Sequence, residues 1–183
     1  MTSDDHLLVP LYSVAGAARH LDVPASTFRT WAHGYRNHPR GRPPVAGEPI
    51  VTTVPADSGV SIPFIGLAEA YALAAIRGAG VPLQRIRPAL DRLREELGIE
   101  HVLASQKLFT DGAEVLYDYA EDHGDTPEGR SARELVVVRN NQRVFNEIIE
   151  SYLRRIKFRD NQWGQLIHLP KYQDQSRQDQ VDG

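Results

Sequence analysis

The sequence contains no cysteine and a single methionine among its 183 residues. A chain without cysteine can form no disulfide bond and no thiolate metal site, and it has no thiol nucleophile. Such a chain suits a reducing compartment, so we expect a cytoplasmic protein.

Long apolar runs are also missing. No stretch of about 18 apolar residues occurs, so we expect no transmembrane helix. The first residues, MTSDDHLL, are acidic where a secretory signal would be basic. With 41% hydrophobic and 25% charged residues, the composition is that of an ordinary globular protein.

The chain lacks an overall excess of positive charge, because its formal net charge is −3. A strongly acidic protein would be repelled by duplex DNA. The charge is uneven, however: residues 19–42 carry five arginines against Asp22, a local charge of 5 − 1 = +4. A basic segment in an otherwise acidic chain is typical of small DNA-binding proteins that also contact another protein.

The common catalytic signatures are absent too. The sequence has no GxGxxG, GxxxxGK[ST] or GxSxG motif, and its seven histidines form neither HxH nor HExxH. The acidic residues of 118–125 crowd together without the regular spacing that would hold a metal or an acid–base pair, and we predict a solvated polar loop over 118–132. We therefore expect no enzyme, no metal and no cofactor.

Residues 12–36, YSVAGAARHLDVPASTFRTWAHGYR, predict two short helices joined by a tight turn. Ser13 is a good N-cap, and apolar residues at i, i+3, i+4 and i+7 from Val14 give one buried stripe. Asp22-Val23-Pro24 supplies the turn, and Gly34 ends the second helix. In that helix Phe28 and Trp31 lie three apart and face the core. This pattern indicates a helix-turn-helix, whose second helix enters a DNA groove.

The polar residues of the second helix are the candidate groove contacts. Arg29 is expected either to bind guanine O6 and N7 or to contact only a phosphate, while a purely structural interpretation makes Ser26 and Thr27 a helix cap. The predicted contacts are Ser26, Thr27, Arg29 and Thr30.

Residues 36–49, RNHPRGRPPVAGEP, predict an extended basic loop and no helix, because four prolines and two glycines interrupt the stretch. The candidate contacts to the DNA backbone or the minor groove are Tyr35, Arg36, Arg40 and Arg42; the alternative is a solvated loop. Residues 50–54 and 60–64 predict a β-hairpin, the wing of a winged helix-turn-helix.

The rest of the chain predicts a mixed body. We expect a helix from 67 stopped by Gly78, a helix over 83–97 that Pro88 kinks or restarts, and a strand over 134–138. Further expected elements are a hairpin over 106–118 with an Asp-Gly turn, a helix over 144–156, a hairpin around 160–164 and a disordered polar tail. Five arginines near the 83–97 helix are expected to pair with acidic neighbours, the alternative being a role in docking DNA or a partner: Arg77, Arg85, Arg87, Arg92 and Arg94.

The N-terminal motif resembles the MerR-type winged helix-turn-helix in Tyr12-Ser13-Val14, Ala17-Ala18, Val23-Pro24, Ser26-Thr27, Arg29 and Trp31. A wider resemblance covers 61–90, 101–112 and 141–158, which are similar to the MerR-like antitoxins of VapBC-type toxin–antitoxin systems. The resemblance implies a repressor of its own operon, a double-stranded operator, and a PIN-domain ribonuclease toxin as partner. A MerR-like regulator with a small effector is the alternative.

The expected fold class is α+β, a MerR-like winged helix-turn-helix followed by a mixed helix and β-hairpin body. The expected divisions are a DNA-binding module over 1–64, a body for dimerisation and partner docking over 65–170, and a disordered tail over 171–183. Helix-turn-helix proteins bind DNA as dimers to reach two half-sites, so we expect a homodimer.

Overall fold

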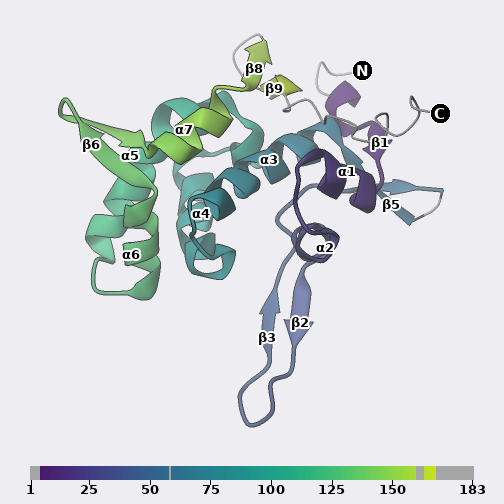
Figure 1. Cartoon of the computed structure of the whole chain (residues 1–183), viewed down its shortest axis with the longest axis horizontal. Helices are drawn as coiled ribbons and strands as arrows, with labels where there is room; N and C mark the ends of the chain where they lie inside the picture. The colour runs from purple at the N-terminus through teal and green to yellow at the C-terminus, as the bar shows by residue number, and fades with distance from the viewer. Residues whose placement is uncertain (1–4, 58, 160–162, 168–183) are drawn as a thin grey trace, which may run out of the picture.

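The structure, a computed structural model, describes residues 5–57, 59–159 and 163–167 (Figure 1). It is a mixture of helices and small antiparallel sheets. Within the described residues the helices are α1 Val14–His20, α2 Ala25–His33, α3 Phe64–Gly78, α4 Leu83–Leu97, α5 Gln106–Asp122, α6 Pro127–Glu134 and α7 Glu147–Leu153, with 3-10 turns η1 Asp5–Leu8 and η2 Val102–Ala104.

The strands form four separate sheets in the same part of the chain. One is three-stranded in the order β1-β5-β4, and the others are the pairs β2-β3, β6-β7 and β8-β9, all antiparallel. Their bounds are β1 Pro10–Tyr12, β2 Tyr35–Asn37, β3 Val45–Gly47, β4 Val54–Ala56, β5 Gly59–Pro63, β6 Val136–Arg139, β7 Gln142–Phe145, β8 Ile156–Arg159 and β9 Trp163–Ile167.

Helix α3 is the centre of the molecule. Every residue from Ile65 to Ile76 is buried, as expected of a helix that is apolar all round. In Figure 1, α1 and α2 lie on one side of α3, and α4 to α7 lie on the other. One apolar cluster runs through all of them, including Phe28, Leu73, Leu93 and Leu153. The N-terminal helices therefore pack on the same core as the body.

Several predicted elements are confirmed. Ser13 caps α1 by accepting a hydrogen bond from the Gly16 amide at 3.0 Å. Asp22 lies in the turn with φ of 53°, and Gly34 ends α2. The expected hairpin of 50–64 is present as β4 and β5, and the last hairpin as β8 and β9. The expected helices from 67 and over 83–97, and the strand over 134–138, are also found.

The hairpin predicted over 106–118 is wrong, because α5 runs through it. Ser105 accepts a hydrogen bond from the Leu108 amide at 3.4 Å and caps the helix. Gly112 is helical because it faces the core: a Cβ there would lie 3.0 Å from Leu108 Cδ1 and 3.2 Å from Phe145 Cζ. The Asp-Gly pair thus allows close packing and does not form a turn.

The polar loop predicted over 118–132 is also wrong. Residues 118–122 continue α5, and α6 follows after a short turn. Thr126 caps α6 by accepting from the Gly129 amide at 3.0 Å, and Pro127 occupies the first turn. A threonine cap followed by proline in the first turn is a typical signal for the start of a helix.

Three further expectations need correction. The loop predicted over 36–49 contains a ladder, with Arg36 opposite Ala46 and Asn37 opposite Val45, because its prolines fall outside the paired residues. The helix predicted over 144–156 is only α7, which Asn146 caps, since β7 and β8 take the flanking residues. Helix α4 does not restart at Pro88; Pro88 and Gln84 are both exposed, so the carbonyl freed by the missing amide can face water. The predicted tail of 171–183 lies outside the described residues.

Candidate nucleic-acid interface

Helix α2 divides its side chains between the core and the surface. Phe28 is fully buried and Trp31 is 3% exposed, and they pack with the buried alanines of α1 in one cluster. Spacing of three to four residues places such pairs on one helix face. The opposite face of α2 is turned toward the surface.

That outer face carries the predicted groove contacts. Ser26 and Arg29 are exposed, and Thr27 and Thr30 are half-buried. The Thr30 hydroxyl donates a hydrogen bond to the Ser26 carbonyl oxygen at 3.0 Å. The N-cap residue of α2 is Pro24, and no side chain caps the helix, so the interpretation of Ser26 and Thr27 as a cap is wrong. The first amides of α2 therefore keep the polarity that favours a phosphate.

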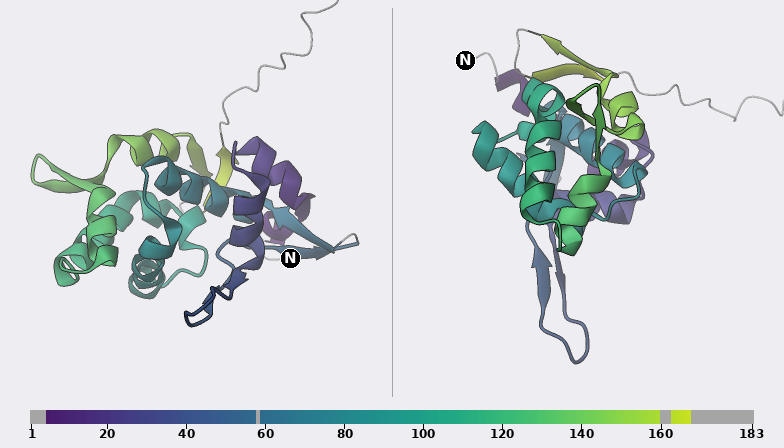
Figure 2. Two further views of the ribbon diagram at one scale, coloured as in Figure 1. Left: turned by 60° about the horizontal axis from the view of Figure 1, so that its bottom comes forward. Right: turned by 90° about the vertical axis from the view of Figure 1, so that its left-hand side faces the viewer.

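A two-stranded arm leaves the body next to the end of α2. We call residues 35–47, with strands β2 and β3, the arm; Figure 1 and the right-hand view of Figure 2 show it projecting away from the helices. Arg36, Arg40 and Arg42 on the arm are exposed, whereas Tyr35 at its base is half-buried. The arm sequence YRNHPRGRPPVAG contains no acidic residue. The arm thus presents positive charge without internal neutralisation.

The β4–β5 hairpin has the opposite character. Residues 54–63, VPADSGVSIP, include Asp57 but no lysine or arginine. The cations that a DNA-binding hairpin needs are therefore on the arm, and the hairpin that the sequence predicted as the wing has none.

The base of the arm is fixed to α2 by main-chain hydrogen bonds. The backbone amides of Ile50 and Val51 both donate to the carbonyl oxygen of Trp31, at 2.8 and 3.1 Å. Because Trp31 is a core residue of α2, the segment that follows the arm is held against the end of that helix. The arm and α2 are consequently parts of one surface.

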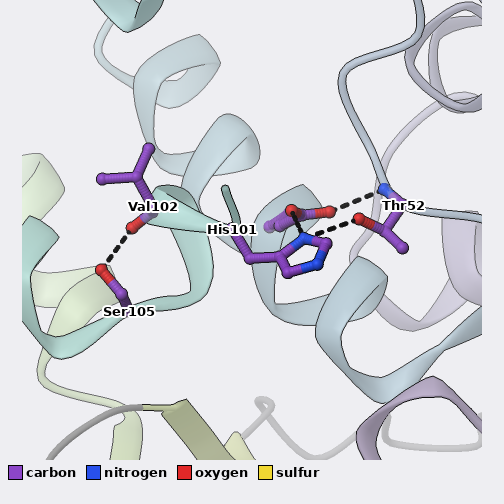
Figure 3. Close-up of polar contacts among 5 residues, drawn as sticks. Thr52, His101, Val102 and Ser105 are labelled. Atoms are coloured by element: carbon purple, nitrogen blue, oxygen red, sulfur yellow. Dashed lines mark hydrogen bonds and ion pairs between the residues drawn. The ribbon is translucent and has the colours of Figure 1, made fainter. Parts of the chain in front are cut away.

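A partly buried polar cluster, shown in Figure 3, holds the next part of this segment. The Glu69 carboxylate on α3 accepts from the Thr52 amide at 2.6 Å, and His101 Nδ1 lies 3.0 Å from both Glu69 Oε1 and Thr52 Oγ1. The Glu69 hydrogen bond raises the pKa of His101, against a smaller lowering by burial. Sequence reasoning missed this cluster, although a lone acid in the apolar run of α3 is a signal for it.

The cluster contains the residue types of a hydrolytic triad but not its geometry. A triad histidine contacts its acid with one ring nitrogen and its nucleophile with the other. Here Glu69 and Thr52 both meet Nδ1 of His101. The cluster borders an open cleft of about 450 Å³, and its geometry supports a link between α3 and the segment after the arm. Elsewhere in the described ranges, no group of three or more histidine and acidic side chains could hold a metal ion.

The N-terminal part of the chain matches a known protein family. Residues 10–90 match the family described as "Putative DNA-binding HTH domain", so the chain carries an N-terminal helix-turn-helix domain of the DNA-binding class, as the sequence predicted. Over the described residues, no helix is long and apolar enough to cross a membrane.

A curated relative matches most of the chain. It is 50% identical over 169 residues, 91% of this chain and 70% of the other, to a protein of Mycobacterium tuberculosis (strain ATCC 25618 / H37Rv) named "Putative antitoxin VapB45". The chain belongs to the same family as that protein. The crystal structure of Rv2018 from Mycobacterium tuberculosis superposes with a TM-score of 0.75 at 46% identity, covering 91% of this chain and 72% of that one. The match to a DNA-binding helix-turn-helix family and the relative named an antitoxin together point to a non-enzymatic regulator.

Proposed function

We propose that this chain is a DNA-binding antitoxin that represses its own toxin–antitoxin operon. The observation that carries the proposal is the continuous surface made by the outer face of α2 and the basic arm, tied together at Trp31. A helix with its apolar face in the core and an uncapped, polar N-terminal end is suited to a DNA groove. Kinship with VapB45 supports the antitoxin role.

The two parts of the surface have different tasks. Ser26, Thr27, Arg29 and Thr30 lie in the major groove, where Arg29 binds either a guanine edge or a phosphate. Arg36, Arg40 and Arg42 follow the backbone or enter the minor groove beside it. Tyr35 stands at the base of the arm, where it orients the arginines that follow.

The body over 65–170 serves protein partners. We propose that it forms the homodimer that lets two α2 helices reach two half-sites, as in MerR-type proteins. We also propose that it binds a PIN-domain ribonuclease toxin, as antitoxins of VapBC type do. The name of the relative supports this pairing.

The test is fluorescence anisotropy of the full chain on the duplex upstream of its own gene and on a shuffled duplex, across a salt series. Preference for its own DNA, with affinity falling steeply as salt rises, is the expected result, because phosphate contacts release counterions. Equal, weak binding to both duplexes would overturn the repressor role. Co-purification with the product of a neighbouring PIN-domain gene tests the toxin pairing.

A pocket supports a second candidate, a MerR-like regulator that responds to a small effector. A mostly apolar cavity of about 200 Å³ lies between α2 and α3, with Thr27 and Trp31 on one wall and Leu73 and Arg77 on another. A ligand there would contact the recognition helix directly. A rise in melting temperature with one member of a metabolite panel, together with changed DNA affinity, would favour this candidate.

A further inference from the structure

The arginines at the end of α3 and along α4 fall into two groups. Arg92 pairs with Glu96, and Arg94 pairs with Asp91 at 3.0 Å. The remaining three, Arg77, Arg85 and Arg87, make no ion pair with any acid in the part of the chain that the structure describes. The intrahelical pairing predicted for all five therefore holds only for the two nearer the end of α4.

Two of the unpaired arginines border the helix-turn-helix. Arg77 lines the same cavity as Thr27, in the first turn of α2. The Arg87 guanidinium carbon lies 6.0 Å from the centroid of the Tyr35 ring, and Tyr35 directly follows the residue that ends α2. The two cations consequently lie beside the two ends of the recognition helix.

Arg87 and Arg85 lie on different faces of α4. Leu83 lines the cavity against α2, and Arg87 is four residues further on, which places it on the same face of α4. Arg85 is two residues from Leu83, about 200° around the helix, and therefore faces away from the helix-turn-helix. Arg85 is exposed, so it offers the same charge on the same helix in a different direction.

Arg87 also has unmet hydrogen-bonding capacity. Its Nε and Nη2 atoms are buried and have no acceptor among the described residues. Buried polar atoms are normally hydrogen-bonded, and leaving them unpaired is costly. Tyr35, whose ring faces the guanidinium, belongs to the arm, so a small shift of the arm would open these donors to an incoming acceptor.

We propose that Arg77 and Arg87 extend the DNA-binding surface from the helix-turn-helix onto the body, each contacting a backbone phosphate beside one end of α2. The inference rests on the proposed DNA binding. Guanidinium groups match phosphate oxygens in charge and in geometry. Both side chains adjoin residues of the DNA-facing surface, Thr27 and Tyr35, and this position favours DNA over an acidic protein surface as the partner.

The experiment measures full-chain binding to the upstream and shuffled duplexes across a salt series. Arg77→Gln and Arg87→Gln are each expected to weaken binding to both duplexes by about fivefold near 0.15 M salt, the counterion release of one phosphate contact. The slope of log affinity against log salt should become shallower by about 0.9. Arg→Lys at either position keeps the charge and should restore the slope.

Arg85→Gln is the matched control, since it removes the same charge from α4 on the other face. This variant should leave the salt slope unchanged and should change the affinity by no more than about twofold. An equal effect of Arg85→Gln and Arg87→Gln would mean that the positive charge of α4 acts on DNA without a specific contact, and it would overturn the proposal. Unchanged slopes in the Arg77→Gln and Arg87→Gln variants would also overturn it and would redirect these side chains to a protein partner.

Two further comparisons separate loss of a DNA contact from loss of stability and from failure of the proposed repressor function. If Arg87→Gln lowers the melting temperature, Arg77→Gln and Arg87→Lys carry the test, because neither removes the charge beside Tyr35. If the unmodified chain prefers its own upstream DNA and the variants match it, only this inference fails. If the unmodified chain shows no preference, the proposed repressor function fails first and takes this inference with it.

Discussion

Gly66, in the first turn of α3, lies against the backbone carbonyl oxygen of Thr52 so closely that a Cβ atom has no room. The same helix also binds the Thr52 amide, which donates a hydrogen bond to the Glu69 carboxylate at 2.6 Å. Glycine is unfavourable inside a helix by about 1 kcal/mol relative to alanine. The close approach of the segment that follows the arm explains why glycine stands there.

We expect Gly66→Ala to destabilise the protein. The clash is with backbone, which cannot rotate away as a side chain can, so the cost should be about 1–3 kcal/mol, as for other overpacked sites. For a chain of this size, each kcal/mol lowers the melting temperature by roughly 2–4 °C. Thermal denaturation followed by circular dichroism measures the shift.

Gly78→Ala is the control on the same helix. A Cβ there would meet nothing closer than the Tyr152 hydroxyl at 3.6 Å, an ordinary contact. Alanine should leave the melting temperature unchanged or raise it, because its helix propensity is better. Equal melting temperatures for the two variants would contradict the close approach at Thr52.

Arg29→Ala is expected to weaken binding to the upstream duplex at least tenfold without changing the melting temperature. Arg29 is exposed on the outer face of α2, so its loss leaves the core intact. A guanine contact is worth about 1–3 kcal/mol of discrimination, and its loss should also reduce the preference over a shuffled duplex. A phosphate contact would instead weaken binding to both duplexes alike. Unchanged affinity would remove Arg29 from the interface.

Replacing Arg36, Arg40 and Arg42 together by glutamine should weaken binding to the upstream and shuffled duplexes by similar factors. All three are exposed on the arm, and three phosphate contacts correspond to a change in salt slope of about 2.7. Asp57→Asn on the β4–β5 hairpin is the control, and we expect little change. A larger effect from the hairpin than from the arm would reverse the assignment of the DNA-facing element.

The N-terminal module was predictable because its signals are local. A serine cap at Ser13, a turn at Asp22 and a terminating glycine at Gly34 lie within one short stretch. The apolar spacing of Phe28 and Trp31 then fixes which face of α2 is buried. Each of these features depends on neighbours in sequence, so no knowledge of distant packing is needed.

The error at 106–118 has the opposite cause. An Asp-Gly pair predicts a hairpin only when alternating residues flank it, and the buried residues Leu108, Gly112, Leu116 and Tyr119 follow helical spacing instead. The need for glycine comes partly from Phe145, on strand β7. A contact so distant in sequence could not be recognised before the fold was known.

The candidate site shows the same limit. The exposed residues of α2 could be listed from the sequence because they flank the buried aromatic residues of that helix. Those of the arm could be listed because they lie among prolines. Arg87, far along the chain, could not be placed beside Tyr35 from periodicity. Nor could Glu69, His101 and Thr52 be expected to meet, because the chain separates them by tens of residues.

The Glu69–His101 pair predicts that stability depends on pH. The hydrogen bond to Glu69 raises the pKa of His101 above its ordinary value of 6.5; the nearby Glu100 also raises it, whereas burial and Arg94 lower it. A group whose pKa is higher in the folded state stabilises that state fully below its unfolded pKa. This contribution is lost as pH rises through the folded pKa of His101.

We therefore expect His101→Gln to reduce the free energy of unfolding most below about pH 6.5, with the difference from the unmodified protein shrinking at higher pH. Urea denaturation at a series of pH values between 5 and 9, roughly the range in which histidine titrates, measures it. Glu69→Gln removes the negative charge that favours a protonated His101 and should flatten the same part of the profile. A stability difference that stays constant across the series would mean that His101 has the same pKa in the folded and unfolded protein, and that its contacts with Thr52 and Glu69 do not depend on its charge.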